Sequence, residues 1–176
     1  MQVWLIIFTN ILAFILALIF GIGYYKKKKK EKVSQIRAEL WGTAVFIGVM
    51  IFFNGVILYV NYLEEQRVKA AYTQMEKNNE ERGKEEEESF ANLELSLKTD
   101  KNKGPDTHYI YVANFNKKVS FHGKVYIKTI INNKIVDGEY TTKKITLKPG
   151  EKKQIDQFDG TSLYDSYSWE WKGELN

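Results

Sequence analysis

Two long apolar stretches close to the start of the chain limit what it can fold into. Residues 3–23 and 41–62 contain no Asp, Glu, Lys, Arg or His, and they are 21 and 22 residues long. About 20 helical residues cross the ~30 Å hydrocarbon core of a bilayer. Because both stretches are apolar on every face, they are typical of helices in lipid rather than of surface helices. We therefore expect residues 1–62 to form a two-span membrane anchor.

The loop between the two stretches is strongly basic. Residues 25–40 hold seven basic and two acidic side chains. The basic residues are Lys26, Lys27, Lys28, Lys29, Lys30, Lys32 and Arg37. An excess of Lys and Arg marks a cytoplasmic loop, which puts both termini and everything after residue 62 outside the cell membrane. These side chains are also candidates for contact with anionic lipid headgroups. The run lacks interleaved aromatic residues, so no nucleic-acid partner is expected.

A few small or amide side chains interrupt the apolar stretches. Asn10 and Asn54 are amides that need a hydrogen-bond partner in hydrocarbon. Gly42, Gly48 and Gly55 could lie along one side and let the helices approach closely, and Gly48 and Gly55, seven residues apart, share one helix face. These residues predict a contact between the two helices, with a polar site for a permeating solute as the alternative. An ion or proton relay is not expected, because neither stretch contains an ionisable residue.

A charged segment, residues 63–89, follows the second stretch. It contains nine Glu against five Lys or Arg. Val68, Tyr72 and Met75 form a short apolar stripe with helical spacing, which predicts a helix that continues at least to Glu76. Beyond that residue only charge remains, which is typical of a solvated spacer, with a cation or basic-partner site as the alternative interpretation. We expect a charged helical stalk.

From residue 90 to residue 176 the pattern changes to alternation with a period of two. It is clearest from Val119 to Ile131, where apolar and polar residues alternate before a turn at Asn132-Asn133. Further turns are predicted at Asp137-Gly138 and at Pro149-Gly150. About seven short strands fit this region, which predicts a small all-β antiparallel sandwich after the transmembrane hairpin and the stalk.

Three short motifs carry a resemblance to a known family. They are Val112-Ala113-Asn114, Gly123-Lys124-Val125-Tyr126-Ile127 and Leu147-Lys148-Pro149-Gly150-Glu151. In this order the region from Tyr109 to Ile155 resembles the FxLYD-type immunoglobulin-like domains of bacterial cell-surface proteins. The Leu-Tyr-Asp element of that family is absent here, and Thr129-Ile130-Ile131-Asn132 occupies its expected place. The resemblance implies an Ig-like sandwich that acts as an envelope binding or structural module.

Residues with catalytic or metal-binding chemistry are sparse. There is no Cys, and the two His, His108 and His122, are expected at exposed positions. Asp156 and Asp159 could act as an acid and a base or hold calcium, but Asp also forms turns, and we prefer that interpretation. No nucleophile, phosphate or dinucleotide motif is present. The sequence predicts no catalysis, no metal and no cofactor.

The final strand region is rich in aromatic residues. Tyr167, Trp169 and Trp171 share one face, and Tyr164 precedes them. Buried, they complete the core of a small domain without disulfides; exposed, they form a platform for a glycan or a partner protein. We expect at least two of them in the core.

Three functional hypotheses follow, and none specifies an oligomeric state. The first is a non-enzymatic envelope protein that presents its β-sandwich to an envelope protein or glycan. The second is an accessory or immunity-type membrane subunit that acts through its transmembrane helices. The third is an envelope hydrolase that uses Asp156 and Asp159.

Overall fold

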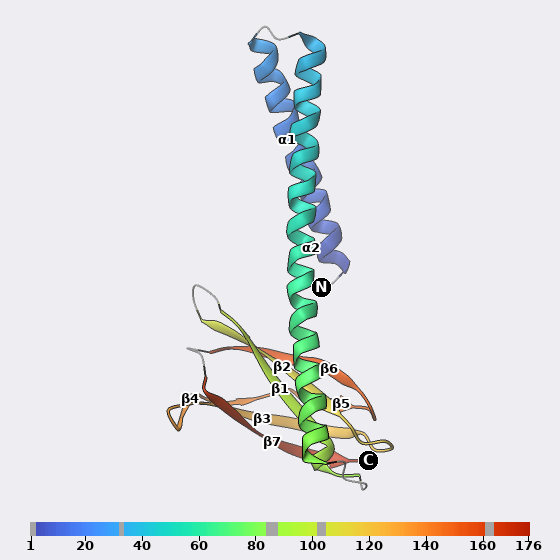
Figure 1. Ribbon diagram of the computed structural model, residues 1–176, viewed down its shortest axis with the longest axis vertical. Helices are drawn as coiled ribbons and strands as arrows, with labels where there is room; N and C mark the ends of the chain where they lie inside the picture. The colour runs from blue at the N-terminus through green and yellow to red at the C-terminus, as the bar shows by residue number, and fades with distance from the viewer. Residues whose placement is uncertain (1–2, 32–33, 84–87, 102–104, 161–163) are drawn as a thin grey trace. The chain divides into compact units, whose positions relative to one another are not determined.

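A computed structural model describes residues 3–31, 34–83, 88–101, 105–160 and 164–176 (Figure 1). The chain divides into two compact units, Met1–Glu65 and Gln66–Asn176. Lys32 and residues 84–87 of the glutamate-rich run lie outside the described residues.

Two helices account for the first unit and the start of the second. Helix α1 is Val3–Lys30 and helix α2 is Gln35–Arg82. Both are long and apolar enough to cross a membrane, by length and composition. The expected stretches 3–23 and 41–62 lie inside them, and no Pro interrupts either run.

Helix α2 continues well beyond the apolar stretch. The sequence predicted helix at least to Glu76, and the helix ends at Arg82. Gly83 follows with φ 82°, a left-handed conformation that glycine adopts without strain and that commonly ends helices.

Seven strands and one short 3₁₀ turn make up the rest of the described second unit. A 3₁₀ turn (Phe90–Asn92), with Ser89 as its N-cap, leads directly into the first strand. The strands are β1 (Leu93–Asp100), β2 (Asp106–Asn114), β3 (Phe121–Ile131), β4 (Lys134–Thr141), β5 (Ile145–Leu147), β6 (Lys152–Gly160) and β7 (Ser166–Leu175). Every pairing between them is antiparallel, as predicted.

The strands form two sheets. In the first sheet β2 lies between β1 and β6. In the second sheet β3 pairs along its whole length with β7, and its other edge pairs with β5 near the start and with β4 near the end. The antiparallel sheets do not close into a barrel, which fits the predicted sandwich.

The hydrophobic core lies between the two sheets. Alternate residues of each strand point into it, because successive side chains of a strand point to opposite faces. The fully buried members are Leu93, Leu95, Leu97, Ile110, Val112, Phe121, Val125, Ile127 and Leu147.

Two of the three predicted turns are confirmed and one is wrong. Asn132 and Asn133, at φ 50° and 62°, make the tight turn between β3 and β4. Gly150, at φ 70°, suits the third position of a type II turn after Pro149. Asp137-Gly138 does not end a strand. It is a bulge inside β4, where Val136 pairs with Thr129 and Glu139 pairs with the adjacent Lys128.

The end of α2 covers the outer face of the first sheet. Ala71 and Met75 are fully buried against Tyr111 and Ala113 of β2, and neighbouring apolar residues extend the contact. These neighbours are Val68, Tyr72, Tyr109 and Phe115. Residues 66–82 therefore form a third layer of the second unit, whereas the sequence predicted a charged helical stalk that becomes a solvated spacer beyond Glu76. The stripe at Val68, Tyr72 and Met75 was visible in the sequence, but the sheet that it covers was not.

Candidate functional site

The two helices of the first unit meet at small residues. A Cβ added to Gly21 would lie 3.0 Å from the carbonyl oxygen of Gly42, and one added to Gly42 would lie 3.0 Å from that of Gly21. Ala13, Ala17 and Ala38 are fully buried. Backbones approach closely where side chains are small, which is how apolar helices associate in the absence of a hydrophobic driving force between them.

Of the three glycines that the sequence singled out, Gly42 lies in this contact, whereas Gly48 and Gly55 do not. A Cβ added to Gly48 or Gly55 would meet nothing within 4 Å, so both face open space. Asn54 donates its amide to the Met50 carbonyl of its own helix at 2.9 Å, and Asn10 is half-buried in α1. The seven-residue spacing correctly places two glycines on one face, but it does not say which face meets the neighbouring helix.

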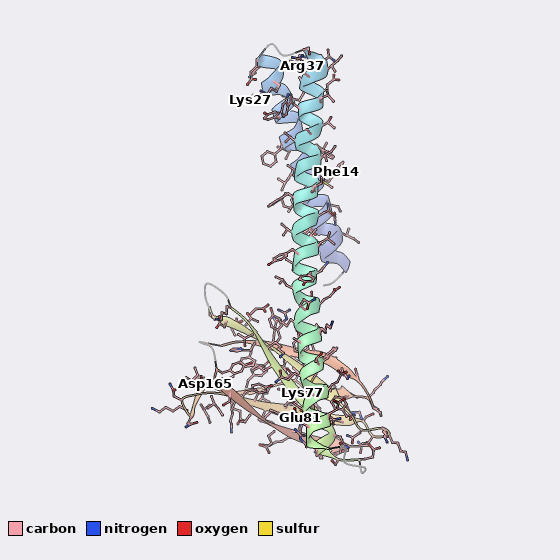
Figure 2. The ribbon with its side chains drawn as sticks, viewed as in Figure 1. Phe14, Lys27, Arg37, Lys77, Glu81 and Asp165 are labelled. Atoms are coloured by element: carbon pink, nitrogen blue, oxygen red, sulfur yellow. The ribbon has the colours of Figure 1, made fainter. Side chains whose placement is uncertain are left out.

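The basic residues that the sequence placed in a loop lie mostly in helices, Lys26 to Lys30 at the end of α1 and Arg37 near the start of α2, and they gather at one end of the helix pair. Lys27 and Arg37, from different helices, lie at this end (Figure 2). Lys28 forms an ion pair with Glu31 at 2.8 Å, while Lys26, Lys29 and Lys30 are exposed. Most of these ammonium groups are thus available to solvent or to anionic groups. Beside them, a groove of about 410 Å³ runs between the helices. Its lining residues are Leu18, Gly21, Ile22, Tyr25, Glu39, Gly42, Thr43 and Phe46.

In the second unit, the aromatic residues of β7 pack on the core. Tyr164, Tyr167, Trp169 and Trp171 are half-buried and contact the cluster between the sheets. The Tyr164 hydroxyl donates to the Leu97 carbonyl at 2.9 Å, and the Tyr167 hydroxyl donates to the Leu95 carbonyl at 3.5 Å. Burial raises the pKa of both tyrosines. This arrangement supports the core interpretation over an exposed aromatic platform.

The expectation for His108 is wrong, because this side chain is fully buried. His108 shares the inward face of β2 with Ile110 and Val112, and its ring packs 5.0 Å from the ring of Phe158. Its Nδ1 lies 2.7 Å from the Thr99 hydroxyl. A histidine in this place completes the end of the core and is not a surface ligand. His122 is exposed, as expected.

Asp156 and Asp159, considered for catalysis or calcium, lie inside strand β6 and not in the turn that the sequence predicted. Each has a separate partner: Asp156 accepts from the Gln157 amide at 3.0 Å, and Asp159 accepts from the Thr107 hydroxyl at 3.1 Å. Asp165, which precedes β7, accepts from the Asn132 amide at 2.8 Å. Asp165 lies at one end of the sheets (Figure 2). Within the described parts of the chain, no group of three or more His, Asp or Glu side chains is placed to hold a metal.

A polar network fastens the end of α2 to the first sheet. The Arg67 guanidinium stacks 3.5 Å from the centre of the Tyr109 ring, donates from Nε to the Tyr111 hydroxyl at 3.1 Å and pairs with Asp100. Desolvation by burial acts to lower the pKa of Arg67, but the bond to Tyr111 and the charge interactions with Tyr111, Asp100 and Tyr109 outweigh it and raise this pKa. One cation thus makes three contacts across the helix–sheet interface.

Further along the helix, one charged residue of β1 is buried beneath it and another is half-buried. The Glu94 carboxyl is fully buried and pairs with Arg82 at 2.8 Å. Burial raises its pKa, while Arg82 and Asn78 act to lower it. Lys98 donates to the Gln74 side chain at 2.6 Å, and burial lowers its pKa. The sequence showed these residues as the polar face of a strand and did not reveal that a helix covers them.

Because α2 covers the first sheet, the open face of the sandwich is the outer face of the second sheet. A groove of about 380 Å³ lies on it, and three lysines and a histidine line it. We call this the β3–β7 groove. Its lining residues are His122, Gly123, Lys124, Tyr126, Lys144, Lys172, Gly173 and Glu174.

The cations of the β3–β7 groove have few contacts with other described side chains. Lys124 and Lys144 are exposed, and neither has an ion-pair partner among the residues that the structure describes. Lys172 lies 4.3 Å from the centre of the Tyr126 ring, and 3.9 Å separates it from Glu170. His122 is oriented by a 2.9 Å contact between its Nδ1 and the Thr146 hydroxyl. The groove can therefore offer several N–H donors to an anion.

The sequence pointed to only part of this groove. The alternation in β3 placed His122 and Lys124 on the outward face, but Lys144 and Lys172 come from distant segments. Lys172 joins them because β7 pairs with β3, where Lys124 lies directly opposite Lys172. Pairing between strands 48 residues apart, counted from 124 to 172, has no local signal in a single sequence.

No family model matches this chain, and no curated protein is similar to it.

Proposed function

We propose that the protein is a membrane-anchored, non-enzymatic module of the cell envelope that binds an anionic ligand in the β3–β7 groove. The observation that supports this most is the asymmetry of the sandwich. One outer face is covered by α2, and the other carries His122, Lys124, Lys144 and Lys172 around a groove. Cations gathered on an open surface attract acidic ligands and speed their association.

The anchoring part of the proposal depends on α1 and α2. Two apolar helices joined by a lysine-rich segment favour a two-pass topology with this segment in the cytoplasm. The second unit is then extracytoplasmic, where the resemblance to FxLYD-type domains also leads. An impermeant amine reagent on intact cells should label Lys124 and Lys144 but not Lys26 to Lys30. Labelling of the lysine run alone would reverse the topology.

The ligand that we propose is an acidic envelope polymer, either a phosphate-bearing or a carboxylate-bearing glycan. Ammonium and imidazole groups recognise such oxyanions through charge-assisted hydrogen bonds. A neutral glycan is not favoured, because the aromatic rings that would stack on it are largely turned to the core.

A direct test compares two double variants of the full-length protein in nanodiscs. Lys124→Glu/Lys144→Glu removes the groove's unpaired cations and should weaken binding of a poly(glycerol phosphate) probe about tenfold or more. Lys117→Glu/Lys118→Glu, at exposed positions away from the groove, makes the same change in net charge. Equal effects of the two variants would mean that only overall charge matters, and the proposed site would be wrong.

A second candidate function acts through the helices, and the groove of about 410 Å³ beside Gly21 and Gly42 favours it. An apolar groove between two helices can accept a helix of another membrane protein. A photoreactive residue placed at Ile22, which lines the groove, should then crosslink to one membrane protein in cells. Crosslinks to lipid alone would remove this candidate.

A further inference from the structure

Strand β7 has a long and regular unpaired edge. Its ten residues pair with β3 in an unbroken register from Ser166 opposite Ile130 to Leu175 opposite Phe121. Among the described residues, no strand pairs with its other edge. Such an edge presents a row of backbone donors and acceptors that another strand can use.

The other outer strands of the sandwich lack this property. The Leu95 and Leu97 carbonyls of β1 accept hydrogen bonds from Tyr167 and Tyr164 hydroxyls. Strand β6 contains a bulge at Ile155, between the residues that pair with Ile110 and Tyr111. Strand β4 contains a bulge at Asp137-Gly138, and β5 has three residues. Bulges, capped carbonyls and short strands all discourage pairing with another chain.

We infer that β7 pairs with β7 of a second copy of this chain, antiparallel and centred on Trp171, so that two second sheets join into one. The inference depends on the strand edge and on charge complementarity, and it does not require the proposed ligand.

The charges on β7 favour this register. Around a two-fold axis at Trp171, Glu170 of each copy lies opposite Lys172 of the other, which gives two favourable cross-strand pairs. The same register places Trp169 opposite Gly173, where an aromatic ring can cover the bare backbone of a glycine.

In the two neighbouring registers, the same charged residues form unfavourable cross-strand pairs. A two-fold axis at Glu170 places the two Glu170 side chains opposite each other. A two-fold axis at Lys172 places the two Lys172 side chains opposite each other, and Glu170 of each copy then lies opposite Glu174 of the other. Like charges directly opposite are destabilising, so the register centred on Trp171 is favoured over both. An axis at Gly173 also places Lys172 opposite Glu174, but it overlaps only residues 170–176, against residues 166–176 for the axis at Trp171. Glu170 and Lys172 are both exposed, and their long 3.9 Å contact within one strand can be exchanged for contacts with the second copy.

Crosslinking of the full-length protein in nanodiscs tests the register. The chain has no cysteine, so an introduced one is unique. Glu170→Cys mixed with Lys172→Cys should form a disulfide dimer, because these positions lie opposite each other. Either variant alone should crosslink poorly, because identical residues are then diagonal, about 7–8 Å apart, beyond the usual reach of a disulfide.

Charge reversal tests the energetics with the same protein. Glu170→Lys or Lys172→Glu alone should weaken dimerisation about tenfold, because two attractive pairs become repulsive. The double variant Glu170→Lys/Lys172→Glu should restore it, and Lys117→Glu should leave it unchanged. A monomeric wild type, a dimer insensitive to the single reversals, or equal crosslinking by each cysteine variant alone would overturn the inference. An insensitive dimer would place the interface elsewhere, for example between helices.

Discussion

Gly123 of β3 and Gly173 of β7 lie directly opposite each other, and a Cβ added to Gly173 would lie 2.6 Å from the Cα of Gly123. A Cβ added to Gly123 would lie 2.8 Å from the Cα of Gly173 and 2.6 Å from the Phe121 ring. Both strands therefore lack a side chain at this pair of positions, and only glycine fits at either one.

Alanine at either of these glycines should destabilise the second unit. Because the atoms in the way belong to backbone, Gly173→Ala should cost about 2–3 kcal/mol of the free energy of unfolding, within the range of overpacked sites. Urea denaturation followed by near-UV circular dichroism measures it. Ser168→Ala, on the exposed face of the same strand, should be nearly neutral. A Gly173→Ala variant as stable as Ser168→Ala would contradict the packing described.

The helix pair of the first unit allows a matched comparison of two glycines. Gly21→Leu should separate α1 from α2, because its side chain meets the Gly42 backbone, whereas Gly48→Leu enters open space. We expect Gly21→Leu to lose about 1–3 kcal/mol and Gly48→Leu to change little. Reversible unfolding in mixed micelles with increasing SDS measures both. Equal losses would show that the close approach at Gly21 is not the stabilising contact.

Arg67 should be more important than an ordinary surface cation. Arg67→Lys keeps the charge but loses the planar group that stacks on Tyr109 while bonding Tyr111. We expect about 2 kcal/mol less stability for the helix–sheet contact, or about thirtyfold faster amide hydrogen exchange in residues 66–82. Lys69→Ala, exposed on the same helix, serves as the control. Unchanged exchange in Arg67→Lys would mean that charge alone holds the helix.

The buried carboxyl of Glu94 predicts a pH dependence. Burial raises its pKa, so the native state keeps this proton to a higher pH than the unfolded chain does. The stabilisation from Glu94 is therefore complete below the unfolded pKa of about 4.3 and is lost as the pH rises through the raised native pKa. Glu94→Gln, which cannot ionise, should gain stability relative to the wild type as the pH rises, by at most about 1.4 kcal/mol per pH unit.

Denaturation of Glu94→Gln and wild type at several pH values between 4 and 8 measures this difference. Glu139→Gln, which removes a half-exposed carboxylate from β4, is the control. A constant difference between Glu94→Gln and the wild type across this range would show that the carboxyl does not titrate with folding.

Local patterns were enough to predict the kinds of elements in this chain. Two uncharged runs predicted α1 and most of the apolar part of α2, and the alternation after residue 90 predicted antiparallel strands. The tight turns at Asn132-Asn133 and Pro149-Gly150 could be predicted because these residues accept the dihedral angles that the turns require.

Relations between distant segments could not be predicted in the same way. His108 was expected to be exposed because it lies near the start of a strand. Which face of the sheet each residue of β2 occupies is set by the pairing of β2 with β1 and β6. Glu94 and Lys98 have the polarity of a solvated face and are nevertheless covered by a helix. The proposed groove needs Lys124 and Lys172 from separate strands. Each of these outcomes depends on tertiary contacts, which override local preference.

The cover that α2 provides decides where this chain can be cut. A soluble fragment that starts at Ser89 would lack α2. It would expose an apolar patch that is prone to aggregation, made of Tyr109, Tyr111, Ala113 and Phe115. A fragment that starts at Gln66 keeps residues 66–82 of α2, which cover this face of the first sheet. Expression of the fragment that starts at Ser89 should therefore yield aggregates. Expression of the fragment that starts at Gln66 should yield soluble, non-aggregated protein.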